Sequence, residues 1–429
     1  MKRSSMLKIT IGSIEELMED QKDPEMSVTT LDPIDRMLDA AESGKSLIKN
    51  RNILHFTYIP NVIHHRDSEQ EKVTQSLLPI LKQSRPSNLL VYGKPGTGKT
   101  LVVRKILSKI QERVEKSNFP IKLIYANSKD ETTLYGLLVS LGRQLNLSEK
   151  ELPSTGLAIS EVFKRLLKNI EDEKINAIFV VDEIDYLAQL VSKTGKDILY
   201  QLTRANERIK SGSLTLVGIS NDLTFKETLD PRVISSLGEE EVVFTNYSVE
   251  QLNKILEDRI KEAFLDDSIE ESALNLCAAM AGREHGDARR AIDLLRVAGE
   301  MAEREQAKKV TEKHIREASQ KIEENKEITA LKSYPLHEKL LIIAVMKANG
   351  ASTGEIYSAY KDLCKIIRQK ELTQRRVTQM LSEIEMSGII TGRIVHQGIH
   401  GRTKKFKLTI PSDMIKQTFS DDLSLEDII

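Results

Sequence analysis

The octapeptide GKPGTGKT at residues 93–100 constrains the fold of this chain more than any other segment. It matches the phosphate-binding loop pattern G-x-x-x-x-G-K-[ST] in full. The apolar run at residues 88–92 predicts a buried strand before the loop, and residues 101–107 predict a helix after it. Glycines let the backbone wrap around a phosphate, and the N terminus of a helix presents N–H donors to an anion. The segment therefore predicts a nucleotide-binding α/β domain.

Two residues at the end of the loop carry the expected chemistry. Lys99 is expected to reach the β- and γ-phosphates of a nucleotide, and Thr100 is expected to hold Mg²⁺. The expected cofactors are therefore ATP or ADP together with Mg²⁺. The other loop positions predicted to line the nucleotide are Gly93, Pro95, Gly96, Thr97, Gly98 and Leu101.

Length and composition limit what else the chain can be. A chain of 429 residues, 40% hydrophobic and 30% charged, is typical of a soluble protein with two to four domains. It contains no run of 18 apolar residues and no apolar start of a signal peptide, so we expect a cytoplasmic protein without a membrane partner. Cys277 and Cys364 match no metal-binding spacing. Because the net charge is only −1, nucleic-acid binding would need a local basic patch.

Strands and helices alternate through the first half of the chain, which predicts a parallel sheet covered on both faces. The predicted strands are residues 88–92, 121–126, 177–181, 214–219 and 241–244. The pattern then becomes all-helical, with helices expected at residues 269–282, 286–303 and 311–323 after one capped by Ser248. The domains expected are a flexible arm (1–45), an ATPase domain (46–247), a helical lid (248–330), a winged helix (331–415) and a tail (416–429).

The last folded unit reads helix, helix, helix, hairpin, which is the order of a winged helix-turn-helix. Thr353 and Thr373 are predicted to cap its second and third helices. Residues 389–395 and 405–410 are predicted strands on either side of a glycine-containing tip.

An apolar strand at residues 178–181 ends in two acids, Asp182 and Glu183. In a sheet with a phosphate loop, Asp182 is expected beside the Mg²⁺ held by Thr100, and Glu183 is expected to orient the attacking water. The alternative is a solvated strand end without a catalytic role.

Three further residues are candidates for sensing the nucleotide. Asn221 ends a strand and is placed to contact the γ-phosphate or the water, although Asn-Asp is also a turn sequence. Arg232 is a candidate arginine finger for a neighbour's nucleotide, or else a surface arginine near a turn. Arg289 begins a lid helix and is placed to reach the nucleotide of its own chain, whereas Arg290 is expected to face solvent. Tyr247 and Arg259 are adenine-pocket candidates that equally fit a core or surface role.

Several motifs occur in one order along the chain: the segments at residues 58–60 and 65–67, the phosphate loop, and residues 181–185, 229–233 and 286–291, followed by the winged helix. Over residues 45–410 the chain thus resembles the archaeal origin-recognition and cell-division-control family of AAA+ replication initiators.

The resemblance implies roles for the matching residues. Those serving the nucleotide are Lys99, Thr100, Asp182, Glu183, Asn221 and Arg289, with Arg232 as a candidate finger. Those implied to cover the adenine or line its site are Tyr58, Ile59, Pro60, Arg66, Tyr247 and Arg259. The family also touches DNA through an insertion after the second strand; here residues 128–153 fill that place, and Lys129 and Arg143 are its only basic residues before Lys150.

A basic surface near the C terminus predicts DNA binding. Residues 391–407 contain no acid, and their predicted contacts to phosphate or the minor groove come from Arg393, Arg402, Lys404 and Lys405. On the third helix, the residues facing away from the apolar stripe are placed to reach the major groove: Gln374, Arg375, Thr378 and Gln379. A solvated charged face or a protein-docking surface is the alternative.

The function we expect is ATP-dependent recognition of duplex DNA at a replication origin, followed by recruitment or loading of an MCM-type replicative helicase. Hydrolysis is expected to be a slow switch, and other copies or paralogues of the chain are expected as partners on DNA. The alternatives are a nucleotide-gated regulator whose winged helix binds promoters or a protein, and a clamp-loader-like ATPase acting on other proteins.

Overall fold

The computed structural model describes residues 46–117, 119–131, 133–194, 198–396 and 402–429. The predicted arm at residues 1–45 and the tip of the predicted hairpin, residues 397–401, lie outside these ranges.

A five-stranded parallel sheet forms the first half of the described chain, in the order β2-β3-β4-β1-β5. All five predicted strands are present, and their ends lie within a residue of the predicted positions, because each apolar run is bounded by polar or turn-forming residues. The strands are β1 (Leu89–Gly93), β2 (Ile121–Asn127), β3 (Asn176–Asp182), β4 (Ser213–Ser220) and β5 (Glu240–Phe244).

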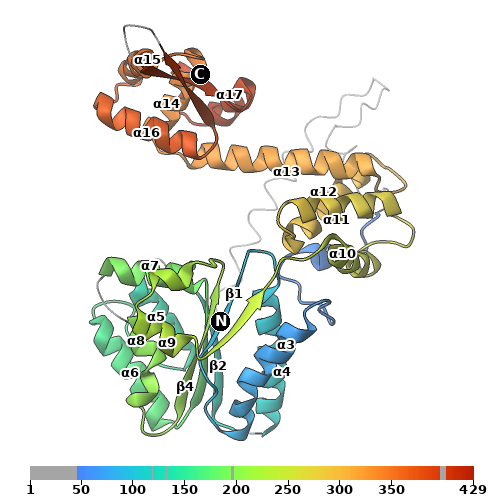
Figure 1. The fold of residues 1–429 in the computed structure, drawn as a ribbon, viewed down its shortest axis with the longest axis vertical. Helices are drawn as coiled ribbons and strands as arrows, with labels where there is room; N and C mark the ends of the chain where they lie inside the picture. Colours follow the sequence, from blue (N-terminus) through green and yellow to red (C-terminus); the bar gives the residue numbers. More distant parts are fainter. Residues whose placement is uncertain (1–45, 118, 132, 195–197, 397–401) are drawn as a thin grey trace, which may run out of the picture. The chain divides into compact units, whose positions relative to one another are not determined.

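Helices cover both faces of this sheet, as Figure 1 shows. Strand β3 explains why: Phe179 packs into one hydrophobic core and Val180 into the other, since successive side chains of a strand point to opposite faces. One core is completed by α3 (Asp67–Leu77) and α4 (Lys99–Ser117). The other is completed by α5 (Leu134–Gln144), α6 (Ile159–Asp172), α7 (Ile184–Thr194), α8 (Ile198–Thr203) and α9 (Pro231–Leu237).

Four helices follow the sheet: α10 (Val249–Ala263), α11 (Glu271–Arg283), α12 (Ala288–Arg304) and α13 (Glu312–Ser333). Ser248 caps α10 as predicted, in a capping box with Gln251. Helix α13 runs ten residues beyond its predicted end at 323, because no proline or glycine interrupts it before the Tyr334-Pro335 step. The short 3₁₀ helix η1 (Arg51–Leu54) adds Ile53 and Leu54 to the core of these helices.

The C-terminal unit has the predicted winged-helix order. It consists of α14 (Leu336–Lys347), α15 (Thr353–Ile366), α16 (Gln374–Met386), β6 (Ile390–His396), β7 (Arg402–Leu408) and α17 (Ser412–Ser420). Strands β6 and β7 pair antiparallel. Thr373 caps α16 as predicted. The prediction that Thr353 caps α15 is wrong by one residue, because Ser352 is followed three residues later by Glu355 and forms a capping box.

The segment predicted as a C-terminal tail takes part in this core. Leu425 and Ile428, the latter in the 3₁₀ helix η6 (Glu426–Ile428), are buried in the same cluster as Leu381 and Phe419. Within the described residues, no helix is both long and apolar enough to cross a membrane. The cytoplasmic location stays a prediction.

Candidate nucleotide site and DNA-facing surface

The phosphate loop joins β1 to α4 and packs against the start of α12. Gly96 and Gly98 have φ angles of 73° and 91°, a region that favours glycine. A Cβ atom on Gly96 would lie 1.7 Å from an oxygen of the Asp287 side chain. The Ala288 N–H donates to the Gly96 carbonyl at 3.2 Å. The loop and the lid therefore meet at a close contact, and any side chain at position 96 would require Asp287 to move.

Lys99 is enclosed by its own loop. Its side chain is buried, and Nζ donates to the carbonyl oxygens of Gly93 and Lys94, each at 2.7 Å. Burial lowers the pKa of Lys99 to about 8; nearby Asp182 opposes this shift, and Arg289 adds to it. An anion at this position would restore the environment that an ammonium group favours.

Asp182, at the end of β3, accepts hydrogen bonds on both carboxylate oxygens. Thr100 Oγ1 donates to Oδ2 at 2.8 Å, and the Tyr125 hydroxyl donates to the same oxygen at 2.7 Å. The Glu183 N–H donates to Oδ1 at 2.9 Å. The predicted pair Thr100 and Asp182 is thus in contact, and its hydroxyl and carboxylate oxygens are ligands that Mg²⁺ prefers.

Glu183 follows Asp182 with a φ of 53°, a left-handed conformation. Its carboxylate forms an ion pair with Lys129, which lies just after β2. Lys129 was considered above only as a DNA contact, and no pattern in the sequence indicated this pairing, since it depends on two strand ends meeting in space.

The strand order places Asn221 at the same carboxyl-terminal end of the sheet as Asp182. It follows β4, whose Ile219 lies opposite Asp182 in register, and its side chain is half-buried. Arg289 lies at the start of α12, near enough to Lys99 to influence its pKa. Arg290, which was expected to face solvent, is instead buried and forms ion pairs with Glu284 and Glu323 at 2.9 and 3.3 Å. That prediction was wrong because α13 packs against α12 on this side.

Arg232 lies at the start of α9 and is exposed. Its guanidinium donates to both Asp230 carboxylate oxygens, at 3.0 and 2.8 Å, and lies 5.1 Å from the ring centre of Tyr200. Its role as an arginine finger stays a prediction.

The residues predicted to line the adenine site form two stacked pairs. Arg66 is buried 3.9 Å from the ring centre of Tyr247, and its Nε donates to the Thr97 carbonyl at 3.0 Å. Arg259 lies 4.6 Å from the ring centre of Tyr58, whose hydroxyl donates to Glu262 at 2.6 Å. These contacts attach the segment before α3 to the loop and to α10. In the sequence between Tyr58 and Arg66, Ile59 is exposed and Pro60 is half-buried.

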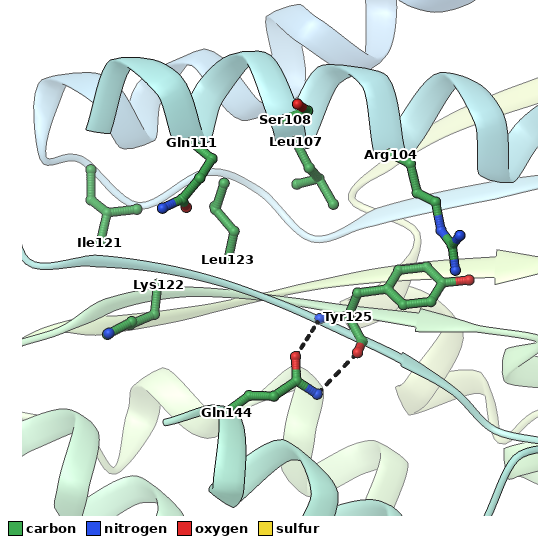
Figure 2. Close-up of a pocket in the computed structure, with 9 residues that line it drawn as sticks. All are labelled: Arg104, Leu107, Ser108, Gln111, Ile121, Lys122, Leu123, Tyr125 and Gln144. Atoms are coloured by element: carbon green, nitrogen blue, oxygen red, sulfur yellow. Dashed lines mark hydrogen bonds between the residues drawn. The ribbon is translucent and has the colours of Figure 1, made fainter. Parts of the chain in front are cut away.

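A separate pocket opens between α4 and the edge strand β2 (Figure 2). The Gln144 side chain accepts from the Tyr125 N–H at 3.2 Å and donates to the Tyr125 carbonyl at 3.0 Å. None of the residues predicted to bind nucleotide lines this pocket. It is lined by Arg104, Leu107, Ser108, Gln111, Ile121, Lys122, Leu123, Tyr125 and Gln144.

The predicted DNA-reading face of α16 is exposed. Its members are exposed, whereas Val377, Met380 and Leu381 of the same helix are buried; they are Gln374, Arg375, Thr378 and Gln379. On the hairpin, Arg393 is exposed and Lys405 half-buried. Lys404 differs, because it forms an ion pair with Glu385 of α16. Arg402 lies at the start of β7.

A sheet with a phosphate loop, followed by a helical lid and a winged helix, defines an AAA+ ATPase with a C-terminal winged-helix domain. Known families match in the same order: an AAA domain at residues 82–225, the Cdc6 AAA+ ATPase-type lid domain at 253–320, and the CDC6 C-terminal winged helix domain at 329–418.

Whole-chain relatives agree with these domain families. The chain is 72% identical over 401 residues to an ORC1-type DNA replication protein of Cenarchaeum symbiosum, covering 94% of this chain and 98% of the relative. It is 42% identical over 402 residues to the ORC1-type protein of Pyrococcus abyssi, covering 92% and 95%. The chain therefore belongs to the ORC1-type DNA replication proteins, which are replication initiators.

Solved structures support the same assignment. The Aeropyrum pernix ORC1 protein, solved in complex with DNA, superposes with a TM-score of 0.80 at 38% identity, covering 90% of this chain and 100% of that one. The Aeropyrum pernix ORC2 protein, solved as ADPNP–ADP complexes, has a TM-score of 0.58 at 22% identity, covers 87% and 98%, and shares the fold alone.

Proposed function

We propose that this initiator binds ATP, recognises duplex DNA at a replication origin in its nucleotide-bound form, and helps to recruit or load an MCM-type replicative helicase. The observation that carries this proposal is the contact between loop and lid at Gly96 and Asp287, because it joins the nucleotide site to the lid that precedes the winged helix. Family membership supports the helicase partner and the association of several copies on DNA.

Each residue at the carboxyl-terminal end of the sheet has a defined task in this proposal. Lys99 offsets phosphate charge, and Thr100 and Asp182 would hold Mg²⁺, which supplies charge stabilisation on the phosphates. Glu183 orients the attacking water. Because Lys129 pairs with the Glu183 carboxylate, this base is engaged in the resting site, which supports slow hydrolysis.

The lid reports the state of the nucleotide. Arg289 follows Asp287, whose side chain caps α12 by accepting from the Arg289 N–H at 2.7 Å. A γ-phosphate near Lys99 would attract Arg289, and its loss would release that attraction. Asn221, at the end of β4, contacts the γ-phosphate or the attacking water. Arg232 acts on the nucleotide of a neighbouring copy.

DNA recognition is assigned to α16 and the β6–β7 hairpin. The exposed amide and guanidinium groups of Gln374 and Arg375 suit base edges or phosphates in the major groove, while Arg393 and Lys405 suit the backbone or the minor groove. The related Aeropyrum pernix ORC1 protein was solved in complex with DNA, which supports DNA binding by this chain.

The test is fluorescence anisotropy of labelled duplexes tiled from the host's origin region, against scrambled duplexes, across a salt series. We expect tight binding to one tile in the presence of ATP, weakened by Gln374→Ala. Thr418→Ser, a conservative change in the core of the same domain, is the matched control. Equal binding to every tile with a steep salt slope would reduce the proposal to a phosphate-binding patch. Absence of binding in every nucleotide state would instead favour a protein-docking regulator.

A further inference from the structure

We propose that Tyr125 is a positioning residue that fixes the Asp182 carboxylate for Mg²⁺-dependent nucleotide binding, and that Arg104 in turn fixes Tyr125. The inference rests on the nucleotide site proposed above and adds two residues to it, neither of which belongs to the phosphate loop or to the acidic strand end.

The register of the sheet brings Tyr125 to Asp182. Asn127 lies opposite Asp182 on the neighbouring strand, and Tyr125 is two residues earlier, so all three side chains leave the same face of the sheet. From there the Tyr125 hydroxyl reaches Asp182 Oδ2 at 2.7 Å. Asp182 is only 5% exposed, so this hydroxyl takes the place of a solvent hydrogen bond on a buried charge.

The two donors to Oδ2 are not equivalent. Thr100 Oγ1 has a second task, because one of its lone pairs is expected to face a metal ion while its proton stays on Asp182. The Tyr125 hydroxyl has no such second task. Together with the Glu183 N–H on Oδ1, the Tyr125 hydroxyl on Oδ2 holds the plane of the carboxylate without itself being a metal ligand.

Arg104 restrains the tyrosine ring from helix α4. It lies one helical turn after Thr100 on α4, so the two side chains share a face of the helix. Its guanidinium carbon is 4.2 Å from the ring centre of Tyr125, and Figure 2 shows the two side chains meeting at the hydroxyl end of the ring. Helix α4 therefore supplies both the Thr100 hydroxyl of the metal site and Arg104, which supports Tyr125.

The test measures the affinity of a fluorescent ADP analogue in EDTA and then through a Mg²⁺ titration, for the full-length protein and for Tyr125→Phe. We expect unchanged affinity in EDTA and a Mg²⁺ concentration for half-maximal effect raised about tenfold, the usual scale for losing an outer partner of a metal ligand. The control is Tyr135→Phe, which removes a hydroxyl that donates to the Pro153 carbonyl at 2.8 Å in the same domain. Identical Mg²⁺ curves for the two variants, or weaker binding by Tyr125→Phe in EDTA alone, would overturn the inference.

Arg104 is tested by the same titration. Arg104→Met is expected to reproduce the Mg²⁺ shift of Tyr125→Phe, Arg104→Lys to restore most of the wild-type curve, and the double variant to shift no further than either single change, since coupled residues are not additive. Additive shifts would separate Arg104 from Tyr125. The nucleotide site is checked independently with Lys99→Ala, which is expected to lose ADP binding with and without Mg²⁺. If wild type binds no ADP, the proposed function fails; if wild type and Lys99→Ala behave as expected but Tyr125→Phe is unchanged, only this inference fails.

Discussion

Lys99 shows how much a single residue can report about this site. Its ammonium group is held by two carbonyl oxygens inside a closed loop, which is an incomplete replacement for water around a charge. The lowered pKa, to about 8, is the measurable trace of that burial. In the free protein, Lys99 therefore exchanges its proton close to physiological pH.

This leads to a pH prediction for nucleotide affinity. Below pH 8 Lys99 is charged and ready for a phosphate, whereas above it the free protein is neutral at this position and must take up a proton on binding. We expect ADP affinity to fall as pH rises from 8 to 10, by up to about tenfold per pH unit. Fluorescence titration measures the affinity, and calorimetry in buffers of different ionisation enthalpy measures the proton uptake. An affinity that does not vary across this range would contradict the shift.

The lowered pKa of Lys99 also makes the free energy of unfolding depend on pH. The pKa of Lys99 is lower in the folded protein than the usual 10.5, so the burial cost is present in full below pH 8. It is relieved as pH rises toward 10.5, because the unfolded chain then binds more protons than the folded one.

A second prediction concerns Lys129, whose ammonium group holds Glu183 in an ion pair. Lys129→Ala is expected to raise the rate of ATP hydrolysis about twofold to fivefold, since partly exposed pairs contribute up to about 1 kcal/mol. Single-turnover assays with Lys150→Ala, an exposed lysine of the same segment, as the matched control measure the change. A slower rate in Lys129→Ala would mean that the lysine assists Glu183 instead of restraining it.

At the scale of elements, the hairpin and α16 are joined by Glu385. One of its carboxylate oxygens accepts from the Gly392 N–H at 3.1 Å, and the other pairs with Lys404, whose Nζ also lies 5.4 Å from the ring centre of Phe406. Lys404 is therefore part of the joint between β6–β7 and α16, which charge patterning alone does not distinguish from a DNA contact.

This arrangement predicts different consequences for two basic residues of the hairpin. Arg393→Ala is expected to weaken duplex binding and to reduce the slope of log affinity against log salt by about 0.9, the value for one phosphate contact. Lys404→Ala is expected to change that slope less, because Glu385 already offsets the lysine charge. Anisotropy titrations at several salt concentrations compare the two. Equal slope changes would show that Lys404 leaves Glu385 to meet the DNA.

How far the sequence predicts each element depends on the range of the interactions involved. The strands, the phosphate loop and the caps at Ser248 and Thr373 follow from residues within a few positions of one another. The pairs Lys129–Glu183 and Tyr125–Asp182 join different strands, and strand order is invisible to local patterning. Arg290 was misjudged for the same reason, since its ion-pair partner Glu323 lies on the next helix.

At the scale of the whole molecule, the residues that the structure describes build four hydrophobic cores: two against the sheet, one in the lid and one in the winged helix. The first and last described segments both contribute buried residues to cores formed mainly by other parts of the chain. Leu47 and Ile48 belong to the lid core, and Leu425 belongs to the winged-helix core. Each domain boundary drawn from the sequence therefore stays a prediction.

Leu425 gives the stability prediction for this scale. Leu425→Ala is expected to cost about 2–5 kcal/mol, the range for a fully buried leucine, and to lower the melting temperature of the winged-helix transition in calorimetry. Leu423→Ala is the matched control, since Leu423 is 88% exposed and two residues away. A change of less than about 0.5 kcal/mol in both variants, typical of surface sites, would mean that residues 421–429 do not support this core.

The two outer strands of the sheet are protected by different means. On β2, the Gln144 amide supplies at Tyr125 the donor and acceptor that a further strand would offer. On β5, Glu240 and Glu241 place exposed negative charge along the other border. Unprotected borders invite strands of other molecules to add on and start aggregation. We propose above that several copies of this protein assemble on one stretch of DNA. The protected edge strands would keep the sheets of neighbouring copies from pairing with one another.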